Sequence, residues 1–389
     1  MGHSDVRSLY VHIPFCERKC EYCDFTSVAG ATGSETYMEA LCAEVRRLGE
    51  RMGRLTLDTV FIGGGTPSLV DPALLAVLVA TVRSAFDVAA GAEVTMEANP
   101  SSISTQRAQV WHDAGVNRIS VGVQSLESDA LAFLGRVHDA DRAIAAVDEV
   151  RAAGFASINC DLIYAVPGLG ETRWRRTLDR VIAAGPTHVS CYELTVEAGT
   201  PLHTSVRRGL VTPVDAARSI RQHRIAVDVL EAAGFEQYEV SNFSTAGEAC
   251  RHNLVYWHNG YYLAAGVGAH GHVPAAAATA LGLDAGKDGV SVRYWHGRGI
   301  TAYGRAIRGG GLAVTGSETV GAQMREQERL MLGLRLREGV RVDATRVAEA
   351  RSLEGLGLVV IEGDRVRATV RGEAVLNQVT LRLVGDQAA

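Results

Sequence analysis

Stretches rich in Val and Ile alternate with helix-like stretches through the first half of the chain, and this alternation limits the fold most strongly. Six apolar stretches have the length and composition of strands, at residues 8–13, 59–63, 93–97, 118–123, 157–163 and 188–193. Helical patterns separate them, at residues 34–51, 72–85, 105–114, 139–153 and 174–184. Strand–helix units in series predict an α/β fold, in which a parallel sheet with helices outside it forms a partial (β/α)6 barrel.

Glycines mark the ends of three predicted helices. Gly115, Gly154 and Gly185 follow these helices, where a residue without a side chain readily adopts the left-handed conformation that ends a helix. The continuous apolar strands also predict a sheet that is buried on both faces. With 389 residues, of which 47% are hydrophobic and 21% charged, the chain can bury one large core and a small appendage. We predict a barrel core at 1–200, an extension at 201–315 and a small domain at 316–389.

The last part of the chain changes character. An amphipathic helix is predicted at 323–336, a second helix at 342–350, and a β-hairpin around the Gly363-Asp364 turn. Together they predict a small helical domain with a wing, whose mixed charge favours packing against the barrel over DNA binding. Gly and Ala between residues 274 and 289 predict a flexible surface connection.

Charge and hydropathy exclude several classes of protein. A net charge of -5 offers no basic field for nucleic acid. The longest apolar helix-like run, 74–82, is far too short to span a membrane. Residues 1–7 are polar and do not look like a secretory leader, so we expect a cytoplasmic protein. Seven cysteines, an odd number, also fit a reducing compartment better than a disulfide framework.

Three of these cysteines lie in one short loop after the first predicted strand. Cys16, Cys20 and Cys23 form a Cys-x3-Cys-x2-Cys run without a fourth cysteine nearby. A four-iron cluster is normally held by four thiolates, so three ligands leave one iron open for chemistry. The alternative is a structural zinc site completed by His12 or a distant residue, although such sites usually pair two short hooks. The other cysteines that lie in apolar surroundings, Cys42, Cys160 and Cys191, are predicted core residues.

Polar residues or glycines end the predicted strands. The second strand leads into Gly63-Gly-Gly-Thr-Pro67, the third into Glu97-Ala-Asn-Pro100, and the fourth into Gln124-Ser125, while Asp161 lies in the fifth. The carboxyl ends of barrel strands share one edge, so we expect these groups to form a single site. The glycine loop lacks the Lys-Ser/Thr of a nucleotide-binding P-loop. Gly266-x-Gly268-x-x-Gly271 matches a dinucleotide fingerprint but lacks its strand–turn–helix context.

Together these motifs strongly resemble the radical S-adenosylmethionine (SAM) enzymes. Within this group, the chain resembles the branch of oxygen-independent coproporphyrinogen III oxidase (HemN) from about Leu9 through His272. Four further motifs carry this resemblance: Tyr10-Val-His-Ile-Pro-Phe-Cys16, Gly122-Val-Gln124, Asp161-Leu-Ile-Tyr-Ala-Val-Pro-Gly168 and Tyr238-Glu-Val-Ser-Asn242. The resemblance implies a radical SAM barrel with a [4Fe-4S] cluster on Cys16, Cys20 and Cys23 and SAM at the open iron. It also implies that Tyr10, Gly64 and Glu97 contact this SAM. Residues matching the second cofactor pocket of the family are Tyr22, Gly65, Thr66, Gln124, Arg136 and Asp161. A second SAM, a tetrapyrrole or nothing could fill that pocket.

Two features separate the chain from the oxidase. Phe25 stands where the oxidase pattern has a further cysteine, and Cys250-Arg-His252-Asn253-Leu-Val-Tyr256-Trp257 carries the His-Asn-x-x-Tyr-Trp motif that marks the HemW haem chaperones. The resemblance implies that such a protein binds haem and delivers it to apo haemoproteins such as respiratory enzymes, with at most peripheral membrane contact. His252, Tyr256 and Trp257 are then the expected haem contacts, with Cys250, His258, His270 and His272 as alternatives. Without the resemblance, composition alone favours a structural histidine and an aromatic pair in a packed loop.

An enzymatic function remains the alternative. The same branch includes coproporphyrinogen III decarboxylation, and the same fold hosts methyltransferases and cyclopropane-forming enzymes that use two cofactors. Each would consume SAM in step with its substrate. The sequence does not decide whether such chemistry is retained.

Overall fold

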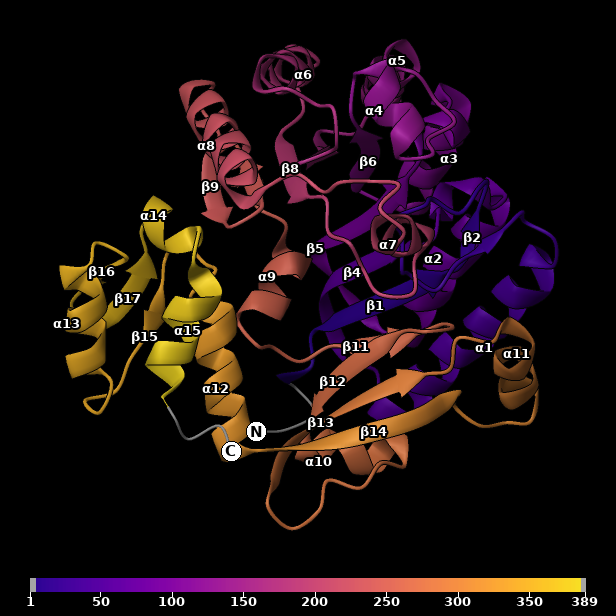
Figure 1. The fold of residues 1–389 in the computed structure, drawn as a ribbon. Coiled ribbons are helices and arrows are strands. Elements are labelled where there is room, and N and C mark those ends of the chain that lie inside the picture. The colour runs from indigo at the N-terminus through magenta and orange to yellow at the C-terminus, as the bar shows by residue number, and fades with distance from the viewer. Residues whose placement is uncertain (1–4, 386–389) are drawn as a thin grey trace.

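The computed structural model describes residues 5–385, so the prediction about a leader in residues 1–7 falls partly outside them. A nine-stranded sheet in the order β11-β1-β4-β5-β6-β7-β8-β10-β9 forms the centre of the molecule (Figure 1). Its six middle strands run parallel, and they are β1 (Ser8–Ile13), β4 (Thr56–Gly64), β5 (Asp87–Ala98), β6 (Arg118–Gln124), β7 (Ser157–Tyr164) and β8 (His188–Glu193). β11 (Leu263–Ala265) continues the sheet in parallel beside β1, while β10 (Asn242–Ser244) and β9 (Glu236–Glu239) are antiparallel at the other edge. The edge strands β11 and β9 do not pair, which confirms a partial barrel.

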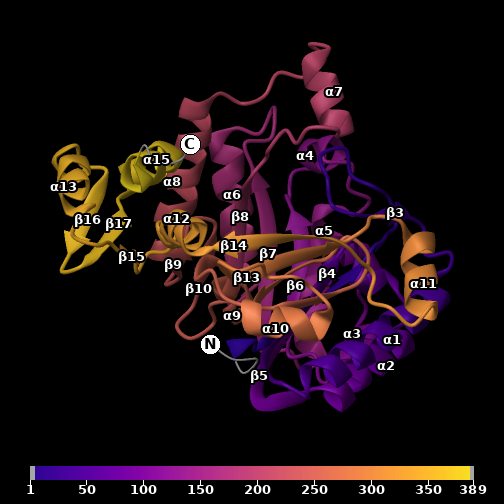
Figure 2. The same cartoon turned by 90° about the horizontal axis from the view of Figure 1, so that it is seen from below.

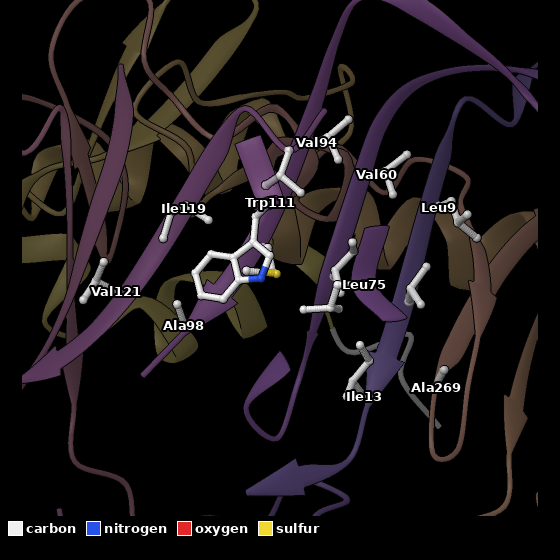
Figure 3. Close-up of a cluster of buried hydrophobic side chains, with 14 of the residues drawn as sticks. Leu9, Ile13, Val60, Leu75, Val94, Ala98, Trp111, Ile119, Val121 and Ala269 are labelled. Carbon is white, nitrogen blue, oxygen red and sulfur yellow. The ribbon is translucent and has the colours of Figure 1, made fainter. Parts of the chain in front are cut away.

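Helices cover the outside of this sheet (Figures 1 and 2). They are α1 (Ser34–Met52), α2 (Pro72–Ala85), α3 (Thr105–Ala114), α4 (Ser128–Phe133), α5 (Ala140–Ala152), α6 (Glu171–Ala183), α7 (Pro201–Arg207) and α8 (Ala216–Ala232). Side chains of four neighbouring strands, Leu9, Val60, Val94 and Ile119, are buried with Trp111 of α3 in one continuous core (Figure 3). Truncation of such a buried aromatic ring costs about 3–5 kcal/mol, so this layer contributes much of the stability.

The predicted strands and helices of the barrel are confirmed to within a few residues, although β5 begins at Asp87 instead of residue 93. The helices α4, α7 and α8 were not predicted. Gly115, Gly154 and Gly185 have φ angles of 103°, 98° and 69°, as expected for residues that end helices. The strands are buried on both faces, but their inner faces are polar. In β5, for example, Thr95 and Glu97 point into the barrel and Met96 points outward, and this alternation gives the barrel a polar lumen.

A second sheet packs beside the barrel. β12 (His270–Pro274), β13 (Gly289–His296) and β14 (Val314–Gly321) are antiparallel neighbours, and α11 (Ile300–Arg308) lies between β13 and β14 in the chain (Figure 1). The prediction of a flexible surface connection at 274–289 is wrong for residues 275–281, whereas 282–288 are an irregular and mostly exposed segment. Residues 275–281 form α10 (Ala275–Ala278) and the 3-10 turn Thr279–Leu281, because their small alanines pack closely: Ala277 and Ala278 are fully buried. β14 crosses the predicted domain boundary at 315/316, and the division itself remains a prediction.

The C-terminal part has its own hydrophobic core, which includes Leu330, Leu353, Val366 and Val379. Its elements are α12 (Ala322–Gly333), β15 (Val340–Arg341), α13 (Val347–Gly355), β16 (Val359–Glu362), β17 (Arg365–Ala368), α14 (Val370–Glu373) and α15 (Leu376–Val384). The predicted hairpin is confirmed, since Glu362 pairs with Arg365 across the turn.

The second helix of this domain begins later than predicted, at Val347. The Asp343 side chain accepts a hydrogen bond from the backbone N–H of Thr345 at 2.9 Å and holds this segment in a turn. The packing of the domain against the barrel is confirmed by backbone hydrogen bonds from Val240 to Arg335 and from Arg337 to Tyr238, at 3.1 and 3.0 Å. None of the helices in residues 5–385 combines the length and apolar character that a membrane span requires.

Candidate functional site

A cavity of about 380 Å³ opens at the carboxyl ends of the parallel strands. It has the size of a small-molecule site. The structure brings most of the predicted site residues together in its lining: Cys16, Cys20, Tyr22, Cys23, Gly64, Gly65, Thr66, Glu97, Gln124, Arg136 and Asp161. They come from loops or strand ends that are far apart in the sequence, and the parallel arrangement of β1 and β4–β8 places them at one edge.

The three cysteines lie in a loop that is closed by a short parallel pair, β2 (Phe15–Cys16) with β3 (Val28–Ala29). Donor groups from other loops approach the sulfurs. The Thr66 hydroxyl donates to Cys16 Sγ at 3.6 Å, and Arg136 Nη1 donates to Cys20 Sγ at 3.6 Å. Such donors favour thiolates over thiols, and thiolates are the form that binds metal.

The chemistry of these thiols fits a multi-iron cluster. Burial raises the pKa of Cys16 and raises that of Cys23 to about 11, so metal binding must displace their protons. A Cβ at Gly65 would lie 2.9 Å from Cys16 Sγ and 2.8 Å from the Pro14 carbonyl carbon, so glycine is needed beside the sulfur. Within residues 5–385, no three His, Cys, Asp or Glu side chains converge as closely as one metal ion requires. Three cysteines in one short loop are the ligand set that a four-iron cluster with one open iron would use.

Two carboxyl groups give the cavity its polarity. Glu97 Oε2 accepts a hydrogen bond from the backbone N–H of Gly64 at 2.9 Å. Asp161 accepts hydrogen bonds from Ser120 Oγ at 2.6 Å and Asn159 Nδ2 at 2.8 Å. Burial, together with the charge of Asp161, raises the pKa of Glu97 to about 8, and burial also raises the pKa of Asp161. Carboxyls held in this way are suited to a ligand that brings its own positive charge, as SAM does with its sulfonium and ammonium groups.

Backbone conformation shapes two parts of the cavity wall. Gly64 has a φ of 119°, and a Cβ there would lie 2.6 Å from the His12 ring, so only glycine fits. Gln124, at the end of β6, has a φ of 64°, a left-handed conformation that is uncommon for a residue with a side chain and is often found at functional sites. Nearby, Arg136 Nη2 donates to the Gly122 carbonyl at 3.0 Å.

Tyr10 is not part of the cavity lining. It stacks on Phe61 with ring centroids 6.2 Å apart, and it forms a hydrogen bond with His12 Nδ1 at 3.0 Å. Contact between Tyr10 and SAM therefore stays a prediction.

A chain of buried hydrogen bonds leads from the cavity down the lumen, and sequence reasoning did not find it. Asp161 is bonded to Asn159, Asn159 Oδ1 to His188 Nδ1 at 2.7 Å, and His188 Nε2 to the Tyr238 hydroxyl at 2.9 Å. Asn253 Nδ2 donates to the same hydroxyl at 3.5 Å. The only sequence signal is the period-two placement of polar residues in β7 and β8.

Asn253 belongs to α9 (Arg251–Trp257), which carries the His-Asn-x-x-Tyr-Trp motif and contacts β4. Glu93 accepts hydrogen bonds from the backbone N–H groups of Arg251 and His252, at 2.8 and 3.0 Å. Glu93 of β5 and Thr59 of β4, which contact α9, precede the residues of these strands that line the cavity at the carboxyl ends. The helix α9 therefore covers the opposite end of the lumen.

The His252 side chain is 0% exposed. Its Nδ1 forms a hydrogen bond with Thr59 Oγ1 at 2.8 Å and its Nε2 with the Tyr256 hydroxyl at 2.9 Å. Burial lowers the pKa of His252 to about 3, so the ring is neutral and both nitrogens are engaged. Trp257 lies toward the C-terminal domain, with the Arg335 guanidinium 6.0 Å from its ring centroid.

Comparison with known proteins identifies the group to which this architecture belongs. The model of the radical SAM superfamily matches residues 10–181. The heme chaperone HemW of Mycobacterium tuberculosis is 38% identical over 384 residues, which are 97% of this chain and 94% of the relative. HemW of Bacillus subtilis is 29% identical over 98% of this chain and 100% of its own length. The chain belongs to the HemW family of radical SAM proteins.

A solved structure related to the HemW family supports the fold. Coproporphyrinogen III oxidase (HemN) from Escherichia coli has a TM-score of 0.79 with this chain, at 19% identity, over 97% of this chain and 90% of the oxidase.

The other candidate haem ligands of this HemW-family chain differ in accessibility. Cys250 is buried and its Sγ donates to Glu93 at 3.4 Å. His272 is buried with both ring nitrogens bonded, and His258 forms an ion pair with Glu338. His270 is exposed. Geometry therefore distinguishes candidates among which the sequence could not choose.

Proposed function

We propose that this protein is a haem chaperone that holds a [4Fe-4S] cluster on Cys16, Cys20 and Cys23, binds SAM at the open iron and delivers haem to apo haemoproteins. The observation that carries this proposal is the nearly end-to-end similarity to HemW of Mycobacterium tuberculosis, which covers the extension and the C-terminal domain as well as the barrel. A bound cluster would supply an open iron and a single electron to the sulfonium.

The residues of this chain would bind and orient the cofactor. Gly64 and Gly65 let the backbone approach without a Cβ, and Glu97 and Asp161 would face the positive groups of SAM. The Thr66 hydroxyl and the Arg136 guanidinium would stabilise charge on the cluster sulfurs. Gln124 and Tyr22 line the remaining wall, where a second ligand would lie.

The His252 ring of the α9 motif is not accessible to haem in this structure. His252 can reach iron only if α9 leaves the barrel, because its ring is fully buried and doubly bonded. Haem contact by His252, Tyr256 or Trp257 is thus a proposal that requires a conformational change. Binding of haem elsewhere on the chain does not.

Delivery requires that haem affinity falls when the acceptor binds. We propose cytoplasmic action on apo respiratory haemoproteins, with peripheral contact at the membrane where these acceptors reside.

The test is haem transfer under oxygen-free conditions. The protein, reconstituted with iron and sulfide, is loaded with haem and mixed with an apo haem b protein of a respiratory complex, with haem-loaded serum albumin as the control donor. We expect faster acceptor loading from the chaperone than from albumin. Cys16→Ala should lose cluster absorbance, whereas Cys42→Ala, which alters a buried cysteine in α1, should keep it.

Other outcomes would decide for the rivals. Failure to bind haem, together with stoichiometric release of deoxyadenosine and a decarboxylated, methylated or cyclopropanated product, would establish an enzyme. Zinc instead of iron and sulfide in wild-type protein would overturn the cluster assignment.

A further inference from the structure

Haem ligation by histidine needs a ring nitrogen that is free to reach iron. Five buried histidines of this chain fail that requirement, because both of their ring nitrogens form hydrogen bonds. They are His12, His188, His252, His272 and His296. Each of these rings holds parts of the fold together.

The histidines outside this group differ in their surroundings. His138 is buried, and His223 and His258 pair with Glu373 and Glu338. His112 lies beside Asp113 on α3, at the outside of the barrel. The side chains of His203, on α7, and His270, at the start of β12, make no hydrogen bond or ion pair within the described residues. His270 is the exposed one of these two.

His270 differs from His203 because it stands on an aromatic surface. It pairs in register with Trp295 of β13, and the two rings stack with centroids 6.1 Å apart and an interplanar angle of 26°. Trp295 in turn pairs with Gly316 of β14, where a Cβ would lie 2.4 Å from the indole ring. Gly316 thus lets the indole lie flat on the sheet and hold the imidazole in a fixed orientation. We call these three residues the His270–Trp295 platform.

Charge near the platform suits an anionic ligand. Arg298, three residues after Trp295, is exposed and forms no ion pair within residues 5–385. Partial burial, the Arg298 charge and His296 lower the pKa of His270, which keeps the imidazole in the neutral form that ligates metal. Haem combines an iron, an apolar macrocycle and two carboxylates. The platform offers an imidazole and an aromatic group, and Arg298 beside it offers a cation without an ion-pair partner in residues 5–385.

The Gly266-x-Gly268-x-x-Gly271 pattern gains a role in this arrangement. It forms the turn from β11 to β12, with φ angles of 100° at Gly266 and 68° at Gly268. A Cβ at Gly268 would lie 2.3 Å from Thr26 Oγ1, so the turn rests against the segment that follows Cys23. The pattern therefore fixes the turn that leads to His270 against the segment after Cys23.

We propose that His270 is an axial ligand of haem, that Trp295 orients its imidazole, and that Arg298 binds a haem propionate. This inference rests on the proposed function and specifies where the cargo binds. The plane of an axial imidazole stands perpendicular to the porphyrin. Trp295, nearly parallel to the imidazole, would therefore meet the porphyrin through its edge. The α9 motif then closes the far end of the barrel without touching haem.

The experiment is an oxygen-free haem titration of the cluster-containing full-length protein, followed by difference absorbance and resonance Raman spectra against the haem-free sample. We expect His270→Ala to lose the histidine-ligated spectrum, and free imidazole to restore that spectrum in His270→Gly. His203→Ala is the matched control and should leave spectrum and affinity unchanged. Trp295→Ala should weaken binding about two- to tenfold, the range expected for a lost aromatic contact.

A second probe tests the charge. Arg298→Glu should weaken binding of haem about two- to fivefold, as expected for an exposed ion pair, and should not change binding of haem dimethyl ester, which lacks free carboxylates.

The outcomes separate this inference from the proposed function. Unchanged spectrum and affinity in His270→Ala would overturn the platform and leave the chaperone function intact. Loss of the histidine-ligated spectrum in His252→Ala, with cluster content and circular dichroism preserved, would also overturn it. A wild-type protein that ligates haem through His270 but transfers none would instead contradict delivery, and one that binds no haem would contradict both.

Discussion

Replacement of Glu97 by glutamine should make the SAM-free protein more stable at alkaline pH while weakening SAM binding. Burial and the nearby Asp161 charge raise the pKa of Glu97 from its ordinary 4.5 to about 8. The folded state therefore holds a proton that the unfolded chain releases near pH 4.5. Stability is fully present below that pH and falls as pH rises to about 8. Glutamine cannot ionise, so the variant avoids this loss while its amide oxygen can still accept the hydrogen bond from Gly64.

The size of the effect follows from the pKa change. A difference of about 3.5 pKa units, at about 1.4 kcal/mol each, changes the free energy of unfolding by about 5 kcal/mol over the full pH range. About 2.5 kcal/mol of this change falls between pH 6 and 8.5. Because Glu97 lines a cavity that admits water, we expect about half of that, roughly 1 kcal/mol.

The assay is urea unfolding, followed by circular dichroism, of cluster-containing protein without SAM at pH 6 and 8.5. The stability advantage of Glu97→Gln over wild type should grow by about 1 kcal/mol between these values. Glu197→Gln, which alters an exposed carboxyl of the same cavity, should show no such growth. If the free energies of unfolding of Glu97→Gln and wild type differed by the same amount at both pH values, the reasoning would be refuted.

Glu97→Gln should weaken the binding of SAM, although it stabilises the SAM-free protein. A hydrogen bond to a charged group contributes about 1.5–3 kcal/mol, so Glu97→Gln should weaken SAM binding at pH 8 by at least about tenfold. Calorimetric titration of SAM into both proteins measures this. A variant that gained stability and kept its affinity would show that Glu97 does not face the cofactor.

Two further substitutions test the framework around the cavity. Gly65→Ala should prevent cluster assembly, because its Cβ would lie 2.9 Å from Cys16 Sγ, whereas Gly91→Ala, with open space around it, should retain wild-type iron and sulfide content. Glu44→Gln should destabilise the fold by about 3 kcal/mol in urea unfolding at pH 7, because it breaks the fully buried ion pair with His296. His296 and the other donors to Glu44 lower the pKa of that carboxyl, so the stabilisation is present above pH 4.5 and is lost as pH falls further.

The barrel was predictable because its signals are local. Each parallel strand is a short apolar run, and glycines such as Gly115 and Gly154 end the helices between them. Parallel topology then places the strand ends together, so Glu97 and Asp161 could be assigned to one site before any coordinates were known. The second sheet was missed because β12, β13 and β14 are separated by long insertions, and their pairing depends on contacts that no local pattern records.

The polar lumen shows where a local signal was present but was interpreted incompletely. In β1, Ser8, Tyr10 and His12 alternate with Leu9, Val11 and Ile13, and only the apolar half entered the prediction. Burial of both faces was inferred correctly, yet a buried inner face with this pattern must satisfy its polar groups through partners on other strands. Those partners are the long-range contacts that the sequence cannot supply.

The same reasoning bears on the α9 motif, which only the resemblance to the HemW chaperones linked to haem, since its composition alone favoured a structural histidine. A histidine, an asparagine and two aromatic residues can serve a ligand or can close a polar lumen, and the residues alone do not distinguish the two. Contacts with Thr59 and Glu93, more than 150 positions earlier in the chain, give α9 the second role in this structure. An exposed imidazole with a free nitrogen, as at His270, meets the requirement for ligation that burial denies to His252. Accessibility, a property of the folded chain, is therefore the reason why we propose His270 and not His252 as the haem ligand.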